Sequence, residues 1–162
     1  MTVCFTGHRP QSLPFGSDEQ HLKCIELKAR LATEIQDMIA RGADTFYVGM
    51  ALGIDTFAAE AVLKEKEDNP KIRLIAAIPC PNQSNSWSKE NKERYDFILS
   101  QCDEKILVSP HYFPGCMHVR NYYMVDRSDI LIAVFDGVSK GGTASTIEYA
   151  IKKNLTVIEL RP

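Results

Sequence analysis

The hydrophobic positions of this chain follow two alternating patterns. The first is a series of short apolar runs that are nearly continuous rather than alternating with polar residues. Runs of this kind are typical of parallel strands that are covered by helices on both faces. We therefore predict strands at residues 2–6, 45–49, 72–78, 105–108, 130–135 and 156–160.

Between these runs, apolar residues recur at three- and four-residue steps, which is the pattern of an amphipathic helix. The longest stripe comprises Leu22, Ile25, Ala29, Ala32, Ile35 and Ile39. We expect a capping box of Ser17 and Gln20 before this helix and Gly42 at its end. Shorter stripes predict helices around residues 57–62, 95–102 and 144–151.

Strands that alternate with helices in this way predict an α/β fold. We expect a Rossmann-like three-layer sandwich with a mainly parallel sheet of about six strands, in an order resembling 3-2-1-4-5-6. The chain contains neither an internal repeat nor a linker, so residues 1–162 are expected to form a single domain.

The overall composition is that of an ordinary globular domain, with 44% hydrophobic and 25% charged residues. The net charge of -2 argues against a general nucleic-acid surface, so nucleic acid is not expected as a partner. The chain lacks a signal-peptide pattern and an apolar run long enough to cross a membrane. Its five cysteines lack any Cys-x-x-Cys spacing, which favours a cytoplasmic location.

Glycine-rich loops follow three of the predicted strands, at residues 6–10, 49–55 and 136–143. In a parallel sheet, ligands bind beyond the carboxyl ends of the strands, and glycines let backbone amides approach a phosphate. A single loop of this kind is more often only a tight turn. Together they predict a site for a phosphorylated nucleotide or a molecule derived from one. The expected ligand contacts from these loops are Gly7, Gly49, Gly53, Gly141, Gly142 and Thr143.

Several side chains in these loops, and Trp87 in the loop before the third helix, each allow two interpretations. His8 and Arg9 are placed to meet a phosphate or a base, although a histidine after a first strand is often only a turn residue. Asp55 suits a bond to a ribose hydroxyl and equally the N-cap of the second helix. Trp87 either stacks on a base or anchors the third helix in the core. We expect no cofactor and no metal.

A metal site would need more ligands than the chain offers in one segment. His111, Cys116 and His118 are the candidates, and they lie near Pro114 and Gly115 in a predicted loop. The aromatic residues Tyr112, Phe113, Tyr122 and Tyr123 in the same region suit either a pocket wall or a contact within a homo-oligomer.

Several segments resemble known families. The turn Gly49-x-x-x-Gly53-Ile54-Asp55 resembles the S-G-x-A-x-G-I-D segment of the DprA/Smf proteins. Met117-His118-x-Arg120, with the later Gly141-Gly142-x-Ala144-Ser145-x-x-Glu148, resembles the LONELY GUY phosphoribohydrolases. Both belong to the SLOG superfamily of Rossmann-like proteins with nucleotide-derived ligands. The opening Gly7-His8-Arg9-Pro10 and the pair Arg120-Asn121 most resemble the YpsA/YspA-like branch of this superfamily.

The resemblance implies nucleotide binding, and the phosphoribohydrolase pattern implies a catalytic pair, Arg120 and Glu148. In that pair an arginine holds the phosphate and a carboxylate stabilises an oxocarbenium-like ribose. This chain departs from the pattern, because Asn121 replaces a lysine and Lys140 replaces a proline. We therefore favour binding or sensing of a nucleotide-derived ligand. Splitting of a nucleoside 5′-monophosphate is the alternative, and DprA-like DNA handling is the third reading.

Overall fold

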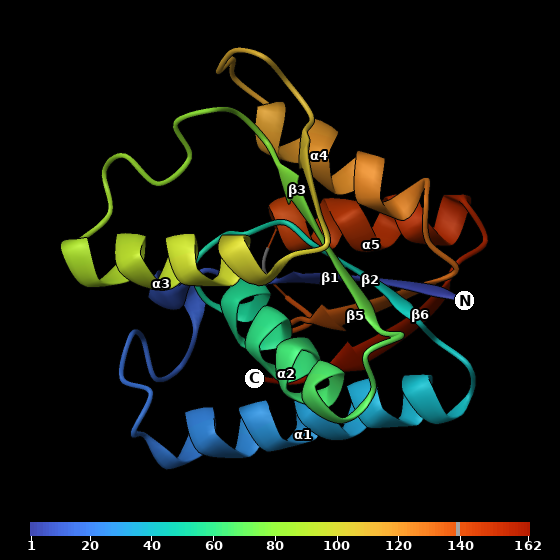
Figure 1. Ribbon diagram of the computed structural model, residues 1–162. Coiled ribbons are helices and arrows are strands. Elements are labelled where there is room, and N and C mark those ends of the chain that lie inside the picture. The colour runs from blue at the N-terminus through green and yellow to red at the C-terminus, as the bar shows by residue number, and fades with distance from the viewer. Residues whose placement is uncertain (139) are drawn as a thin grey trace.

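A computed structural model gives the architecture of residues 1–138 and 140–162 (Figure 1). Ser139, which belongs to the third predicted glycine-rich loop, lies outside the described residues. The elements follow in the order β1 (Thr2–Gly7), η1 (Pro10–Ser12), α1 (Leu22–Ala40), β2 (Thr45–Val48), α2 (Ile54–Asp68), β3 (Arg73–Ile78), α3 (Lys89–Gln101), β4 (Glu104–Leu107), α4 (Cys116–Val125), β5 (Ile130–Val134), α5 (Gly142–Lys152) and β6 (Thr156–Leu160). The predicted α/β class is thereby confirmed.

The described strands form one six-stranded sheet, and all of its neighbouring strands pair in parallel. The strand order is β4-β3-β2-β1-β5-β6, so the predicted order 3-2-1-4-5-6 is wrong in the place of β4. The chain builds outward from β1 to β4 before it returns to place β5 beside β1. The direction therefore reverses between β1 and β5, where a parallel sheet offers a ligand crevice.

Successive residues of the inner strands point to opposite faces of the sheet and enter two separate cores. In β1, Val3 and Phe5 pack in one core and Cys4 packs in the other. The first core lies beneath α1, α2 and α3, and the second lies beneath α4 and α5 (Figure 1). Because both faces are covered, the inner strands β1, β2, β3 and β5 are apolar at most positions, whereas the edge strand β4 is largely exposed.

Helix α1 forms where the periodicity predicts it but turns a different face to the core. Its buried residues are Cys24, Leu27, Leu31, Ile35 and Met38. The predicted stripe is wrong at its start, since Leu22 and Ile25 are 66% and 50% exposed.

The predicted start of α1 is wrong, and its predicted end is confirmed. The helix begins after His21, whose ring accepts a hydrogen bond from the Lys23 N–H at 3.1 Å, so the expected capping box does not start it. At the other end Gly42 has the expected position, and its N–H donates to the Ile39 carbonyl at 2.9 Å.

Helix α4 is an element that the hydrophobic pattern did not predict. It follows Gly115, packs against α5 and buries Arg120 and Met124.

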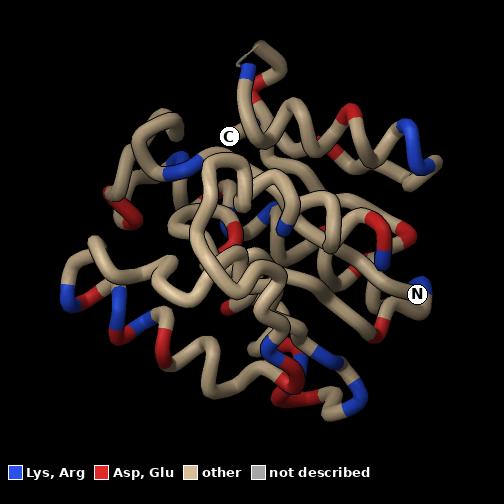
Figure 2. Tube along the Cα trace, turned by 90° about the horizontal axis from the view of Figure 1, so that it is seen from above, with Lys and Arg blue, Asp and Glu red and all other residues tan. Residues whose placement is uncertain are grey.

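Basic and acidic residues are interspersed over the whole trace (Figure 2). Among the described helices, none combines the length and the apolar character that crossing a membrane requires.

Candidate functional site

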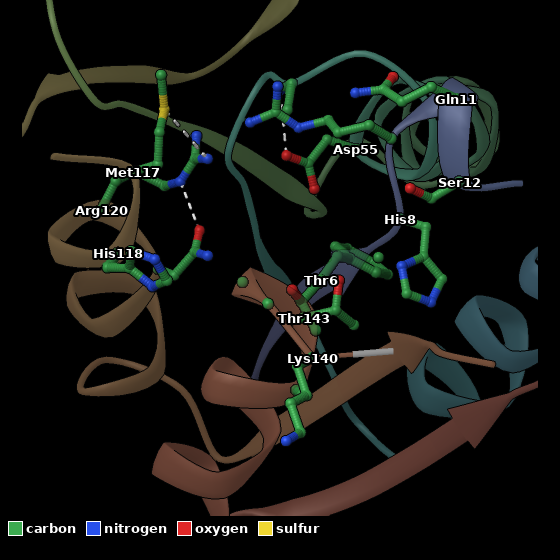
Figure 3. A pocket seen from close by; sticks show the side chains of 18 residues that line it. Thr6, His8, Gln11, Ser12, Asp55, Met117, His118, Arg120, Lys140 and Thr143 are labelled. Carbon is green, nitrogen blue, oxygen red and sulfur yellow. Dashed lines mark hydrogen bonds between the residues drawn. The ribbon is translucent and has the colours of Figure 1, made fainter. Parts of the chain in front are cut away.

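A cavity of about 440 Å³, here called the first cavity, opens where the chain reverses between β1 and β5. It is lined by Phe5, Thr6, Gly7, His8, Arg9, Gln11, Ser12, Ala51, Asp55, Met117, His118, Arg120, Asn121, Lys140, Gly141, Gly142, Thr143 and Ala144. Figure 3 shows Arg120 at one end of this space and His8 at the other, with Asp55 and Thr143 between them. The carboxyl ends of β1 and β2 and the beginnings of α4 and α5 thus meet around one space.

The N-terminus of α5 supplies the part of the cavity wall that is best suited to an anion. Gly141 is the N-cap residue, and Gly142, Thr143 and Ala144 form the first turn of an eleven-residue helix. The first N–H groups of a helix have no partner within the helix, and they lie at the positive end of its dipole. Phosphate oxygens are the groups that such amides bind in proteins.

Arg120 forms the buried wall opposite, and it is only 2% exposed. Its Nη1 donates to the carbonyl oxygen of Gly49, and its Nε donates to Asn121 Oδ1 at 2.7 Å. Burial lowers the pKa of this guanidinium, and the nearby Asp55 carboxylate opposes that effect. Because the ordinary pKa of arginine is so high, the group stays charged and gives the cavity a fixed positive wall.

Gly49 is the point at which β2 admits this guanidinium. A Cβ atom at position 49 would lie 2.6 Å from Arg120 Cζ and 2.8 Å from Asp55 Oδ2. Only a residue without a side chain leaves room for both charged groups. Gly49 therefore acts on the site through its backbone and through the space above it, and it does not itself line the first cavity.

Asp55 is the carboxylate of the first cavity and is 8% exposed. It lies in the first turn of α2, where its Oδ2 accepts a hydrogen bond from the Ala51 N–H at 3.1 Å. Burial raises the pKa of this carboxyl, while the Arg120 charge, the Ala51 N–H and the Arg9 charge lower it. The N-cap of α2 is Gly53, so the predicted N-cap role of Asp55 is wrong, although the side chain does bind the preceding loop.

Asn121 connects the two sides of the cavity, a role that the sequence did not reveal. Its Oδ1 accepts from Arg120, and its Nδ2 donates to Thr146 Oγ1 at 3.1 Å. Thr146 in turn donates to the Gly142 carbonyl at 2.6 Å. A chain of hydrogen bonds thus runs from the buried guanidinium to the first turn of α5. The only sequence signal for it was the position of Asn121 directly beside Arg120.

His8 and Arg9 both line the first cavity, but they differ in how they are held. His8 is 8% exposed, and its Nε2 accepts a hydrogen bond from the Asp136 N–H at 3.2 Å. The ring therefore joins the loop after β1 to the loop after β5. Arg9 is half-buried and faces the cavity from the first loop.

Three of the predicted site residues lie outside the first cavity, namely Gly49, Gly53 and Glu148. Gly53 lines a neighbouring cavity behind the loop that it belongs to. Glu148 is exposed on α5, whose opposite face buries Thr143, Thr146 and Ile147 against the sheet. Of the predicted catalytic pair, the structure therefore brings Arg120 to the cavity and leaves Glu148 outside it. Within the described part of the chain, no group of three or more His, Cys, Asp or Glu residues could hold a metal ion.

The fold is similar to that of a solved structure, DNA processing protein A from Helicobacter pylori, which is described by its single-stranded DNA binding mode. The TM-score is 0.64 at 20% sequence identity, over 98% of this chain and 64% of that one. This chain thus spans less than two thirds of that protein. The finding corrects our expectation that nucleic acid is not a partner, because a protein with this fold binds single-stranded DNA. A net charge of -2 describes the whole chain and says little about one basic cavity.

Relatives with a similar sequence span most of the chain. A UPF0398 protein of Bacillus cereus (strain B4264) is 30% identical over 156 residues, which cover 93% of this chain and 83% of the relative. A UPF0398 protein of Bacillus thuringiensis (strain Al Hakam) matches with the same identity and coverage. The model of the YspA SLOG family matches residues 3–158. The chain therefore belongs to the YspA SLOG family.

Proposed function

We propose that this protein binds a phosphorylated, nucleotide-derived ligand in the first cavity. The phosphate lies on the amides of Gly141, Gly142 and Thr143, and the positive charges of Arg9 and Arg120 face it. The observation that carries the proposal is the convergence of the α5 N-terminus and the basic β1 loop on one 440 Å³ space at the strand reversal. Helix amides and arginine are both preferred phosphate ligands.

The position of Glu148 argues against placing the phosphoribohydrolase reaction first. A carboxylate that stabilises a ribose oxocarbenium must face the sugar. Glu148 is exposed and outside the first cavity, whereas the carboxylate inside it, Asp55, is beside Arg120 and bonded to the Ala51 amide. Binding or sensing therefore accounts for more of the geometry than cleavage does.

A single strand of DNA is the second candidate ligand. It is favoured by the structural similarity to the single-stranded DNA-binding protein of Helicobacter pylori. A strand would place one backbone phosphate in the same cavity, so both candidates use the same contacts. They differ in salt dependence, because a strand that spans several cations loses affinity steeply as salt rises.

Calorimetric titration with AMP, ribose 5-phosphate and adenosine tests the proposal. We expect the phosphorylated ligands to bind and adenosine to bind far more weakly. Arg9→Ala should weaken AMP binding by about 1.5–3 kcal/mol, the range for a hydrogen bond to a charged group. Lys71→Ala is the matched control, since this exposed lysine precedes β3 at the opposite edge of the sheet. Equal affinities for AMP and adenosine would contradict the proposal.

A further inference from the structure

A second cavity, of about 250 Å³, lies behind the loops that wall the first cavity. Neighbouring residues of the same loops face opposite sides. Arg9 and Gln11 line the first cavity, whereas Pro10 between them lines the second. Likewise Ala51 lines the first cavity and Leu52 lines the second. The two spaces are therefore separated by a ridge made of these two loops.

The ridge is narrow because its two loops are in direct contact at Gly53. This residue has φ +90°, and a Cβ atom there would lie 2.9 Å from the His8 carbonyl oxygen and 3.2 Å from Pro10 Cδ. The backbones can approach this closely only when position 53 lacks a side chain. A ligand that crosses the ridge thus has to span little more than two packed backbone segments.

Two aromatic side chains give the second cavity its character. The rings of Trp87 and Tyr95 have centroids 5.4 Å apart and are nearly perpendicular, at 86°. Both residues line the cavity and are half-buried. A planar ring can stack on one of them and meet the edge of the other, which is the arrangement that aromatic groups favour. Phe57, a third ring in the wall, already lies under the Lys28 ammonium at 4.5 Å.

The charges around the second cavity disfavour a phosphate. Among the described residues that line it, Arg94 is the one cation, and its guanidinium is bound by Glu19 and Glu60. Glu90 lines the cavity in the first turn of α3 and is exposed. Carboxylates accept hydrogen bonds and repel anions, so this rim suits the amino groups of a base rather than a phosphate.

We propose that the second cavity binds a nucleobase, and that the ligand consists of two nucleosides joined through phosphate. One phosphate lies in the first cavity, and the base of the second nucleoside crosses the ridge and stacks on Trp87 and Tyr95. This inference rests on the proposed function of the first cavity. It adds a second recognition site and narrows the ligand class from a mononucleotide to a molecule with two bases.

Trp87 is the single tryptophan of the chain, so its fluorescence reports on the second cavity alone. The purified wild-type protein is titrated with ribose 5-phosphate, AMP, diadenosine diphosphate and the phosphodiester-linked dinucleotide pApA. We expect Trp87 emission to be quenched by the two-base ligands and left unchanged by ribose 5-phosphate and AMP. A preference for diadenosine diphosphate identifies a free pyrophosphate-linked ligand, and a preference for pApA identifies a nucleic-acid strand.

Affinities measured by calorimetry provide the second readout. Stacking on an aromatic side chain is worth about 1–3 kcal/mol per base, so Trp87→Ala should weaken binding of the two-base ligand by about 5- to 150-fold. The same change should leave the affinity for AMP unchanged. Trp87→Phe should retain most of the additional affinity that the two-base ligand has over AMP. Phe97→Ala is the control, because Phe97 is 64% exposed on α3 and lines neither cavity.

The outcomes separate the two proposals. If AMP binds but the two-base ligands bind no tighter and leave Trp87 emission unchanged, the second cavity is not a base site and the proposed function stands. Equal quenching by AMP would also overturn the two-nucleoside ligand. If no phosphorylated ligand binds, the proposed function fails and this inference fails with it.

Discussion

At the scale of single residues, Gly49 shows most directly how backbone space creates the site. Gly49→Ala would place a methyl group 2.6 Å from Arg120 Cζ, so one of the two buried charges near it has to move. We expect this overpacking to lower the free energy of unfolding by about 1–3 kcal/mol. Urea denaturation measures the loss. Gly142→Ala is the matched control, because its new Cβ would meet nothing nearer than His118 Cε1 at 4.0 Å; an equal loss in both variants would contradict the argument.

The sequence could identify which residues gather at the cavity better than it could assign their roles. Gly7, Gly141 and Arg120 follow strands or belong to motifs, and all line the first cavity. The burial of Arg120 was not predictable, because its partner Gly49 is 71 positions away. Asn121 appeared only as a departure from an enzyme pattern, whereas the structure bonds it to Arg120 and Thr146.

At the scale of elements, an ionic cluster ties the segment before α1 to two helices. Arg94 on α3 donates to Glu19 at 2.6 Å and to Glu60 on α2 at 2.6 Å, and Lys28 on α1 donates to Glu19 at 2.5 Å. The hydrogen bonds from Arg94, followed by those from Lys28, hold the pKa of Glu19 to about 2, although burial opposes them. The cluster borders the second cavity, so it also fixes one of that cavity's walls.

Acid should therefore weaken the fold through Glu19. A carboxyl with a lowered folded-state pKa stabilises the protein above its unfolded pKa and loses that contribution as the pH falls through the folded value. The window here runs from the ordinary value of 4.5 down to about 2. We expect Glu19→Gln to cost about 1 kcal/mol at neutral pH, the upper range for a partly exposed pair. Between pH 5 and 2 its unfolding free energy should then fall less than that of the wild type.

Urea denaturation at several pH values measures both curves. Glu93→Gln is the control, since Glu93 is 69% exposed and only approaches Lys89 at 3.8 Å. Parallel curves for the wild type and Glu19→Gln would show that the cluster contributes nothing.

The elements themselves were only partly predictable, for reasons of geometry. Buried parallel strands produce apolar runs that are easily recognised in the sequence. The six predicted strands all form within a residue or two of the predicted bounds. The face of α1 was ambiguous because two apolar stripes fit the same period, and long-range packing chose the one with Leu27 and Leu31. The place of β4 beside β3 depends on the edge of the sheet at which the chain adds its next strand. Hydrophobic periodicity carries no information about that choice.

At the scale of the whole molecule, the sheet presents two cavities at its carboxyl edge, on either side of one ridge. The first offers helix amides and arginines, and the second offers aromatic rings with an acidic rim. Homo-oligomer formation stays a prediction, and it matters here because a second copy would offer one route by which an exposed residue such as Glu148 reaches a cavity.

The position of Glu148 outside the first cavity also allows a test for catalysis. We expect AMP incubated with the protein to remain intact, as measured by chromatography of free adenine, because Glu148 is exposed and outside the first cavity. Glu148→Gln should leave AMP binding unchanged, since the exposed carboxylate does not line the first cavity. Release of adenine that Glu148→Gln abolishes would contradict this expectation and would place Glu148 in the catalytic site. Release abolished instead by Asp55→Asn would assign the reaction to the buried carboxylate, which acts on the transition state more than on binding.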